Sequence, residues 1–376
     1  MLSLTLFLYI FIMLSTTLLA KSSQKFYNNG EFQFKNRFFI LAFFIHWFFL
    51  AFTNIGTDHE QYIRIIEYDS AILLLRGSEV GFNSLCVLFY GLTKNAEICI
   101  FIFKTMALMF YYISFYQLRK KADFGLVFFA YNATLYLYSF YVIAHTLAIS
   151  VTILAIVFAV NEKKWYWSLL LAILAFTIHS SAIIVAILLL GVIIIDKINL
   201  KAGLGVLVLG MGVAIYVLTN AGFFFQYAVS NVESFEQYAH YETSSNTGTG
   251  LFNYVLYFYI FIVLLLPYIL SNAPTNLRNL AVVLFLMCFT SSIMGYFLGT
   301  ARFNQYSLSL YGVMIPIILM QSKQGIYKSK LKIPYDVQNI TWKLYLYYAC
   351  YATLSHACKP QGISMLDQYV FFNPFS

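Results

Sequence analysis

The chain has 376 residues, of which 61% are hydrophobic and 10% are charged, and its formal net charge is +8. Soluble domains carry about 25% charged residues, so this composition excludes a chain that covers itself with polar surface. The positive charge comes with no basic stripe or nucleic-acid motif, and no nucleic-acid partner is expected. The mean hydropathy of +0.75 indicates instead that the solvent of this protein is lipid.

Apolar segments follow one another along the chain and predict an all-α fold. A transmembrane helix needs about 20 apolar residues, which predicts a polytopic membrane helical bundle of about 12 spans in a single integral-membrane domain, 1–376. The expected spans are 2–20, 38–55, 97–118, 123–143, 146–160, 165–178, 180–195, 202–219, 251–271, 280–299, 304–321 and 340–357. The segment 81–93, "GFNSLCVLFYGLT", is too short to cross easily, and we interpret it as re-entrant.

The basic residues predict how this bundle is oriented. Cytoplasmic loops of membrane proteins carry an excess of Lys and Arg. Most of the 23 basic residues fall on one side of the expected topology, provided that 81–93 returns to the face from which it starts. The outer face then carries two long loops, 56–96 and 220–250, and the aromatic residues of the second are a plausible platform for sugars.

The first outer loop carries the densest mixture of acids and arginines in the chain. Apolar residues between the charges of 58–76 predict a helix that lies in the membrane interface. On such a helix Tyr62, four residues after Asp58, shares a face with it. Glu79 stands at the mouth of 81–93, and a re-entrant element tolerates polar groups only where it is buried in protein or lines a cavity.

Four short motifs occur in the order in which a known family carries them. They are "GTDHEQY" (56–62), "SEVGFNSL" (78–85), "FTIHSSAI" (176–183) and "ARFNQY" (301–306). In this order the chain resembles the EpsG family, which groups with Wzy-type polymerases of O-antigen, capsule and exopolysaccharide. One position departs from the family pattern, because His145 in "YVIAHTLAIS" stands where an Arg is common. A neutral imidazole cannot replace a guanidinium as a permanent phosphate partner, so either protonated His145 or another cation takes that role.

The resemblance implies a polysaccharide polymerase in the bacterial inner membrane, with its active face outward. Such an enzyme would transfer a growing glycan from its polyprenyl-pyrophosphate carrier onto the sugar end of a lipid-linked repeat unit. The expected partners are the polyprenyl-pyrophosphate-linked oligosaccharide, membrane lipid and a chain-length regulator. The pyrophosphate bond would supply the energy, so no cofactor and no metal are expected.

The reaction implied by the resemblance needs a base that removes a proton from the acceptor hydroxyl. The candidate catalytic residues are Asp58, Glu79 and His179, and the imidazole has an ordinary pKa of about 6.5 that suits acid or base work. Each also has a structural interpretation. Asp58 is then a solvated loop carboxylate, Glu79 a helix cap or salt-bridge partner, and His179 a hydrogen-bonded structural residue.

The reaction also needs cations that hold the leaving pyrophosphate. A guanidinium binds phosphate in a bidentate manner, which makes Arg302 the foremost candidate, and an ionisable residue inside a span, such as Lys104, is often functional. The alternative for the interfacial arginines and for Lys104 is snorkelling to the headgroups. The candidate substrate-binding residues are Arg302, Arg64, Arg76, Lys104, His145, Tyr62 and Tyr306.

Two other functions remain open at this point. One is a ligase or acyltransferase that uses a lipid-linked donor, and the other is a flippase for the same lipid-linked sugar. A flippase needs charges deep in several helices, whereas the candidates here collect on one face and only Lys104 is clearly deep. The five cysteines lie in or beside apolar segments without a CxxC pair, and we interpret them as small buried hydrophobes.

Overall fold

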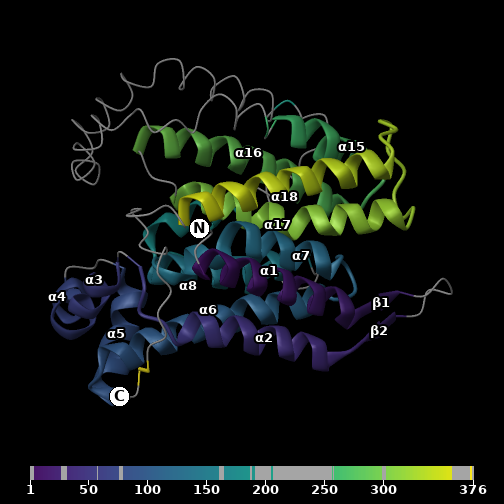
Figure 1. The fold of residues 1–376 in the computed structure, drawn as a ribbon. Helices are drawn as coiled ribbons and strands as arrows, with labels where there is room; N and C mark the ends of the chain where they lie inside the picture. The colour runs from purple at the N-terminus through teal and green to yellow at the C-terminus, as the bar shows by residue number, and fades with distance from the viewer. Residues whose placement is uncertain are drawn as a thin grey trace.

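The computed structural model describes residues 4–26, 32–56, 58–75, 79–160, 165–186, 189–190, 205, 256, 258–298, 302–357 and 373–374. Most of these residues are helical, as predicted (Figure 1). The α-helices are α1 (Leu4–Ser23), α2 (Asn36–Ala51), α3 (His59–Arg64), α4 (Ser70–Leu75), α5 (Val80–Thr93), α6 (Ala96–Leu118), α7 (Phe124–Tyr131), α8 (Ile143–Val160), α9 (Trp165–Ile178), α15 (Leu266–Ile269), α16 (Thr275–Leu298), α17 (Arg302–Lys323) and α18 (Tyr335–Ala357). Shorter π and 3-10 turns are η1 (Ile65–Asp69), η2 (Asn132–Tyr136), η3 (Leu137–Phe140), η4 (Ser180–Ala182) and η6 (Phe261–Leu265).

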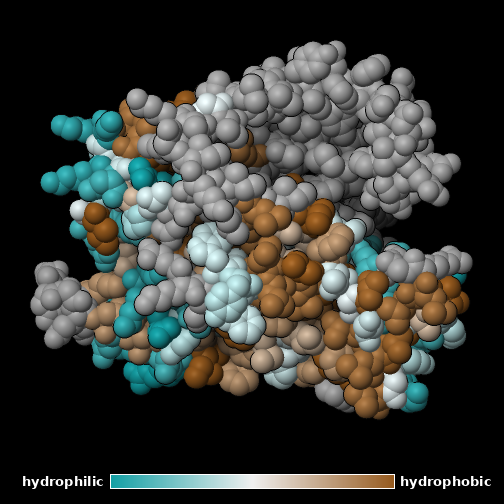
Figure 2. Space-filling view, turned by 180° about the vertical axis from the view of Figure 1, so that it is seen from behind, coloured by the Kyte–Doolittle hydropathy of each residue, from teal (hydrophilic) through white to brown (hydrophobic). Residues whose placement is uncertain are grey.

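Three of the described helices are long and apolar enough to cross a membrane, namely Thr5–Ser23, Ala96–Leu118 and Ile143–Val160. Shorter apolar helices accompany them, including Asn36–Ala51 and Trp165–Ile178. Large apolar side chains remain exposed on these helices except α8, and Figure 2 shows apolar residues spread over the middle of the molecule. The protein is therefore a helical membrane protein. The total of about 12 spans stays a prediction, because part of 180–195, nearly all of 202–219 and the whole loop 220–250 lie outside the described residues.

The long helices form a bundle around α8. Figure 1 shows α16, α17 and α18 on one side, α2 and α6 on the other, and α1, α7 and α8 between them. Helix α8 contacts α6, α9 and α17, and nearly all of its side chains are buried. A helix that is apolar all round belongs in the interior, and this explains the central place of α8.

The predicted interfacial segment 58–76 is helical over its described length, as α3, η1 and α4 in succession. Together with α5 these elements gather at one end of the bundle (Figure 1), where α5 packs against α4, α6 and α9. Helix α5 has 14 residues, which is about 21 Å and shorter than the ~30 Å hydrocarbon core. The shortness predicted for 81–93 is therefore confirmed, while its re-entrant placement stays a prediction.

A β-hairpin that the sequence analysis did not predict lies at the other end of the bundle (Figure 1). Strands β1 (Gln24–Phe26) and β2 (Phe32–Phe34) pair antiparallel with Lys25 opposite Gln33. The Gln24 amide nitrogen donates to Arg119 O at 2.7 Å and to Ala122 O at 2.8 Å. The hairpin thus satisfies two carbonyls of the turn that follows α6, and strands of three residues are too short to leave a periodic signal in the sequence.

Candidate functional site

A polar cavity of about 150 Å³ lies where α3 and α5 meet the N-terminal end of α8 and the C-terminal end of α9. Its lining consists of Asp58, Gln61, Tyr62, Ile65, Leu73, Glu79, Phe82, Asn83, Val142, Ala144 and His179. All three candidate catalytic residues and Tyr62 are in this lining, although they come from three separate sequence motifs. A larger groove of about 410 Å³ between α2 and α6 is lined almost entirely by apolar and aromatic side chains and offers no acid, base or cation.

Two residues of the first motif approach the cavity from α3. Asp58 occupies the N-cap position of α3 without a capping hydrogen bond from its side chain, and its carbonyl accepts from Tyr62 N at 2.9 Å. The Tyr62 hydroxyl accepts a hydrogen bond from Ala144 N at 3.2 Å. Because the first N–H groups of a helix have no partner within it, Tyr62 satisfies one of those of α8. Asp58 and Tyr62, which were predicted to share a helix face, both line the cavity.

Glycines allow the two carboxylates to come close to α8 and α9. Gly56 has a φ of +118°, and a Cβ added to it would lie 2.8 Å from Tyr141 Cα. A Cβ added to Gly81 would clash with the Thr177 side chain and lie 2.9 Å from the Thr177 carbonyl carbon. Each glycine stands two positions from a cavity carboxylate, Asp58 or Glu79. Sterics therefore explain why both motifs have glycine at these positions, since a larger residue does not fit there.

Glu79 is held in an uncommon backbone conformation beside the cavity. Its φ of 41° and ψ of 52° are left-handed, which costs about 1–3 kcal/mol for a residue other than glycine and is frequent at functional sites. Glu79 is the N-cap residue of α5 and its carbonyl accepts from Asn83 N at 3.0 Å, but its side chain makes no capping hydrogen bond. Its Oε1 lies instead 3.6 Å from His179 Nδ1, which makes the ion-pair geometry the observed one.

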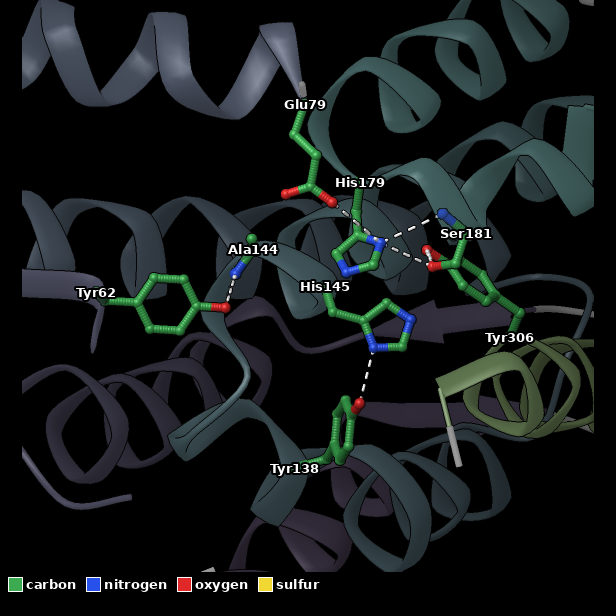
Figure 3. Close-up of polar contacts among 8 residues, drawn as sticks. All are labelled: Tyr62, Glu79, Tyr138, Ala144, His145, His179, Ser181 and Tyr306. Carbon is green, nitrogen blue, oxygen red and sulfur yellow. Dashed lines mark hydrogen bonds and ion pairs between the residues drawn. The ribbon is translucent and has the colours of Figure 1, made fainter. Parts of the chain in front are cut away.

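His179 links the cavity to a buried polar cluster (Figure 3). It follows α9 with extended backbone, and its Nδ1 accepts from Ser181 N at 3.3 Å and lies 2.8 Å from Ser181 Oγ. Ser181 Oγ in turn donates to the Tyr306 hydroxyl at 3.2 Å. The His179 side chain is only 10% exposed. The ring is therefore fixed on one edge while it still contributes to the cavity lining.

His145 and Tyr306 stand behind His179 rather than in the cavity lining. The His145 ring centroid is 4.7 Å from that of His179 and 5.0 Å from that of Tyr306. Both His145 and Tyr306 are fully buried, and the Tyr138 hydroxyl lies 2.7 Å from His145 Nδ1. The structure thus gathers these two predicted substrate-binding residues at the site, in a position that supports His179.

The predicted cations are not in the described cavity lining. Arg64 is 77% exposed and lies 3.5 Å from Asp69 Oδ2. Lys104 is buried and donates to Thr53 O at 2.6 Å. Arg76 lies outside the described residues, and Arg302 begins α17 one helical turn before Tyr306, with only its backbone described.

Several residues of the site were missed by the sequence analysis. Gln61 and Asn83 lie inside the quoted motifs, where they carried no chemical signal of their own. Tyr138 and Tyr141 lie outside every motif in a stretch rich in tyrosine. Tyr141 lies close enough to Asp58 to interact with the charge of that carboxylate. The proximity of Tyr141 to Asp58 arises only from folding.

A comparison with protein families covers the whole described site. A model of the EpsG family matches residues 36–360. No curated protein and no solved structure matches the chain. The matched range runs from the start of α2 to beyond α18 and includes every residue of the cavity lining.

Proposed function

Because the chain belongs to the EpsG family, whose polymerases are Wzy-like, we propose that it is a polysaccharide polymerase whose active site is the polar cavity. The enzyme transfers a polyprenyl-pyrophosphate-linked glycan onto a lipid-linked repeat unit at the outer face of a bacterial inner membrane. The observation that carries this proposal is the convergence of Asp58, Glu79 and His179 in one cavity.

The Glu79 and His179 pair suits general base catalysis. An imidazole that is oriented by a carboxylate is the arrangement that activates hydroxyl groups in many enzymes. Here Glu79 Oε1 lies 3.6 Å from His179 Nδ1, so the carboxylate favours a proton on that nitrogen and stabilises the imidazolium. The other ring nitrogen of His179 then accepts the proton from the acceptor hydroxyl.

The lining favours a sugar hydroxyl over a phosphate as the group that enters the cavity. Carboxylates, carboxamides and a phenol bind hydroxyl groups, and the described lining contains Asp58, Gln61 and Asn83 but no Lys or Arg. Two carboxylates repel a pyrophosphate. A volume of about 150 Å³ is room for roughly one six-membered ring, which supports the terminal sugar of the acceptor as its occupant.

The bond changes follow from this placement. The acceptor hydroxyl gives its proton to His179, its oxygen forms a bond to the anomeric carbon of the donor, and the bond from that carbon to the pyrophosphate breaks. Polyprenyl pyrophosphate leaves with the electron pair. Bidentate guanidinium contacts are the chemistry that neutralises this leaving group, and we assign it to Arg302, with Arg76 as a second contributor.

The test is reconstitution of the full chain in vesicles with one defined lipid-linked repeat unit and no nucleotide. A ladder of products spaced by one repeat is expected on a gel, and His179→Gln should abolish it while leaving membrane insertion unchanged. Substrate that stays one unit long but reaches the other leaflet would replace the polymerase with a flippase. A single transfer to a different lipid acceptor would replace it with a ligase.

A further inference from the structure

We propose that the groove between α2 and α6 binds one anionic phospholipid, with an acyl chain in the groove and the lipid phosphate on Arg37 and Arg119. These arginines stand where the groove meets the β-hairpin, at the end of the bundle opposite the polar cavity (Figure 1). The lipid site is therefore separate from the proposed active site, and the inference does not depend on the proposed function.

The groove is an apolar strip that follows one face of each helix. Its lining residues recur three and four positions apart, from Asn36 to Phe43 on α2 and from Met109 to Tyr116 on α6, and residues at this spacing are neighbours on a helix surface. Each strip is about 10 Å long, which is less than half of the ~30 Å hydrocarbon core. With a volume of about 410 Å³, the groove suits part of one acyl chain from a single leaflet.

Positive charge stands at one end of this strip. The start of α2 lies beside the end of α6, because the ring centroids of Phe39 and Tyr116 are 5.9 Å apart. Arg37 is exposed and precedes the lining residue Ile40 by three positions. Arg119 follows Tyr116 by three positions, and its guanidinium carbon lies 4.0 Å from the Tyr116 ring centroid. Both arginines therefore continue the helix faces that line the groove.

The hairpin braces this end of the groove. The Phe34 ring of β2 lies 5.6 Å from the Phe39 ring and 5.7 Å from the Tyr116 ring. Within the described residues neither Arg37 nor Arg119 makes an ion pair. The nearby Asp123 carboxylate is engaged in capping α7, where it accepts from the main chain at 3.1 Å. The positive charge beside the groove is thus available to an anionic ligand.

Charge complementarity favours an anionic phospholipid as the occupant. In a membrane an apolar groove of this kind is filled by lipid chains, and the charges at its end select the headgroup. A guanidinium binds phosphate in a bidentate manner, and basic pockets between transmembrane helices on the cytoplasmic side bind anionic headgroups. The basic residues of this end are those that predict a cytoplasmic face. The polyprenyl carrier of the proposed reaction would be used at the opposite end.

The test measures binding of phospholipid to the purified full chain in neutral detergent by native mass spectrometry. Phosphatidylglycerol and phosphatidylcholine with identical acyl chains are the probes, and the wild type should bind the anionic lipid more tightly. The double variant Arg37→Gln/Arg119→Gln should weaken that binding about 30-fold, roughly fivefold for each cation near a membrane surface, and leave phosphatidylcholine unaffected. Lys328→Gln/Lys330→Gln removes two exposed charges between α17 and α18. This charge-matched control should resemble the wild type.

A second substitution tests the apolar part of the site. Ile113 lines the groove and is 41% exposed, so the larger side chain in Ile113→Trp should fill the groove and weaken binding of phosphatidylglycerol while both arginines remain. Leu88→Trp introduces the same ring at an exposed position of α5 and should bind lipid as the wild type does. Thermal unfolding in lipid-free detergent checks that each variant is folded.

Equal binding of the two phospholipids by the wild type would overturn the proposal, as would phosphatidylglycerol binding that survives both the arginine and the Ile113 substitutions. Polyprenyl phosphate that binds more tightly and displaces phosphatidylglycerol would assign the groove to the carrier instead. These measurements need no turnover. A chain that selects the anionic lipid but makes no polymer would refute the proposed function and leave the inference intact, and a polymerase without this selectivity would do the reverse.

Discussion

Glu79 Oε1 lies 3.6 Å from His179 Nδ1, across the gap between the start of α5 and the end of α9. Each of the two residues has a non-helical backbone at this point. Glu79 has a left-handed backbone, and His179 interrupts helical geometry between α9 and η4. This contact therefore arises where two helix ends meet, and helix termini rather than helix centres bring these two side chains together.

The charge of Glu79 should matter for turnover and for its pH dependence. Glu79→Gln keeps the size of the side chain but removes the charge that favours protonated His179, so the acid limb of the pH–rate profile should move to lower pH. Turnover should fall about 10- to 100-fold. Initial rates with the lipid-linked substrate from pH 5 to 9 measure both. Glu60→Gln, an exposed acid in α3, serves as the control, and an equal response of the two variants would contradict the assignment.

Asp58 should be needed for reaction and not for assembly. Asp58→Asn removes a carboxylate from the cavity lining while the main-chain hydrogen bond to Tyr62 remains. We expect turnover to be lost and membrane insertion and melting temperature to stay near those of the wild type. Asp69→Asn breaks only an exposed pair with Arg64 and should cost less than 1 kcal/mol. Normal turnover in Asp58→Asn would reduce Asp58 to a loop residue.

Gly81 should be irreplaceable for packing, whereas another glycine of the same helix should not. In Gly81→Ala the new Cβ meets Thr177 in α9, and overpacking of this kind costs about 1–3 kcal/mol. A Cβ at Gly91 meets nothing within 4 Å, so Gly91→Ala should stabilise α5 by up to about 1 kcal/mol. Thermal unfolding in detergent compares the two. Equal melting temperatures would mean that α5 and α9 do not pack as described.

Arg302 should act through its guanidinium rather than through charge alone. Arg302→Lys keeps one positive charge but loses the planar fork that binds phosphate in a bidentate manner. We expect turnover to fall at least tenfold, about the value of one charge-assisted hydrogen bond. Arg119→Lys, at the hairpin end of the bundle, is the control and should retain full activity. Unchanged kinetics in Arg302→Lys would remove Arg302 from the site.

Lys104 should affect stability more than substrate affinity. Its ammonium group is buried and donates to Thr53 O at 2.6 Å, so Lys104→Met leaves that carbonyl without its donor. The expected result is a lower melting temperature with an unchanged KM for the lipid-linked substrate. The exposed Lys120→Met should change neither quantity. A raised KM with normal stability would instead support the substrate-binding role predicted from the sequence.

The sequence was sufficient for the class of the protein because that class depends on composition. A chain with 10% charged residues has to place its helices in lipid, and the apolar runs at 97–118 and 146–160 coincide with α6 and the main part of α8. The charged stretch after α2 also lies at the end of the bundle that carries the polar cavity. The family motifs also contain Asp58, Glu79 and His179, which the structure brings into one cavity.

Which residues touch could be decided only by the tertiary structure. A helix such as α8, buried on nearly every face, has no polar side that would reveal its orientation, so the sequence could not place His145 against His179 and Tyr306. Nor could it show that Lys104 turns to the Thr53 carbonyl. Composition fixes the solvent of a chain, whereas the pairing of buried polar groups is set by how separate helices pack, and the site depends on that packing.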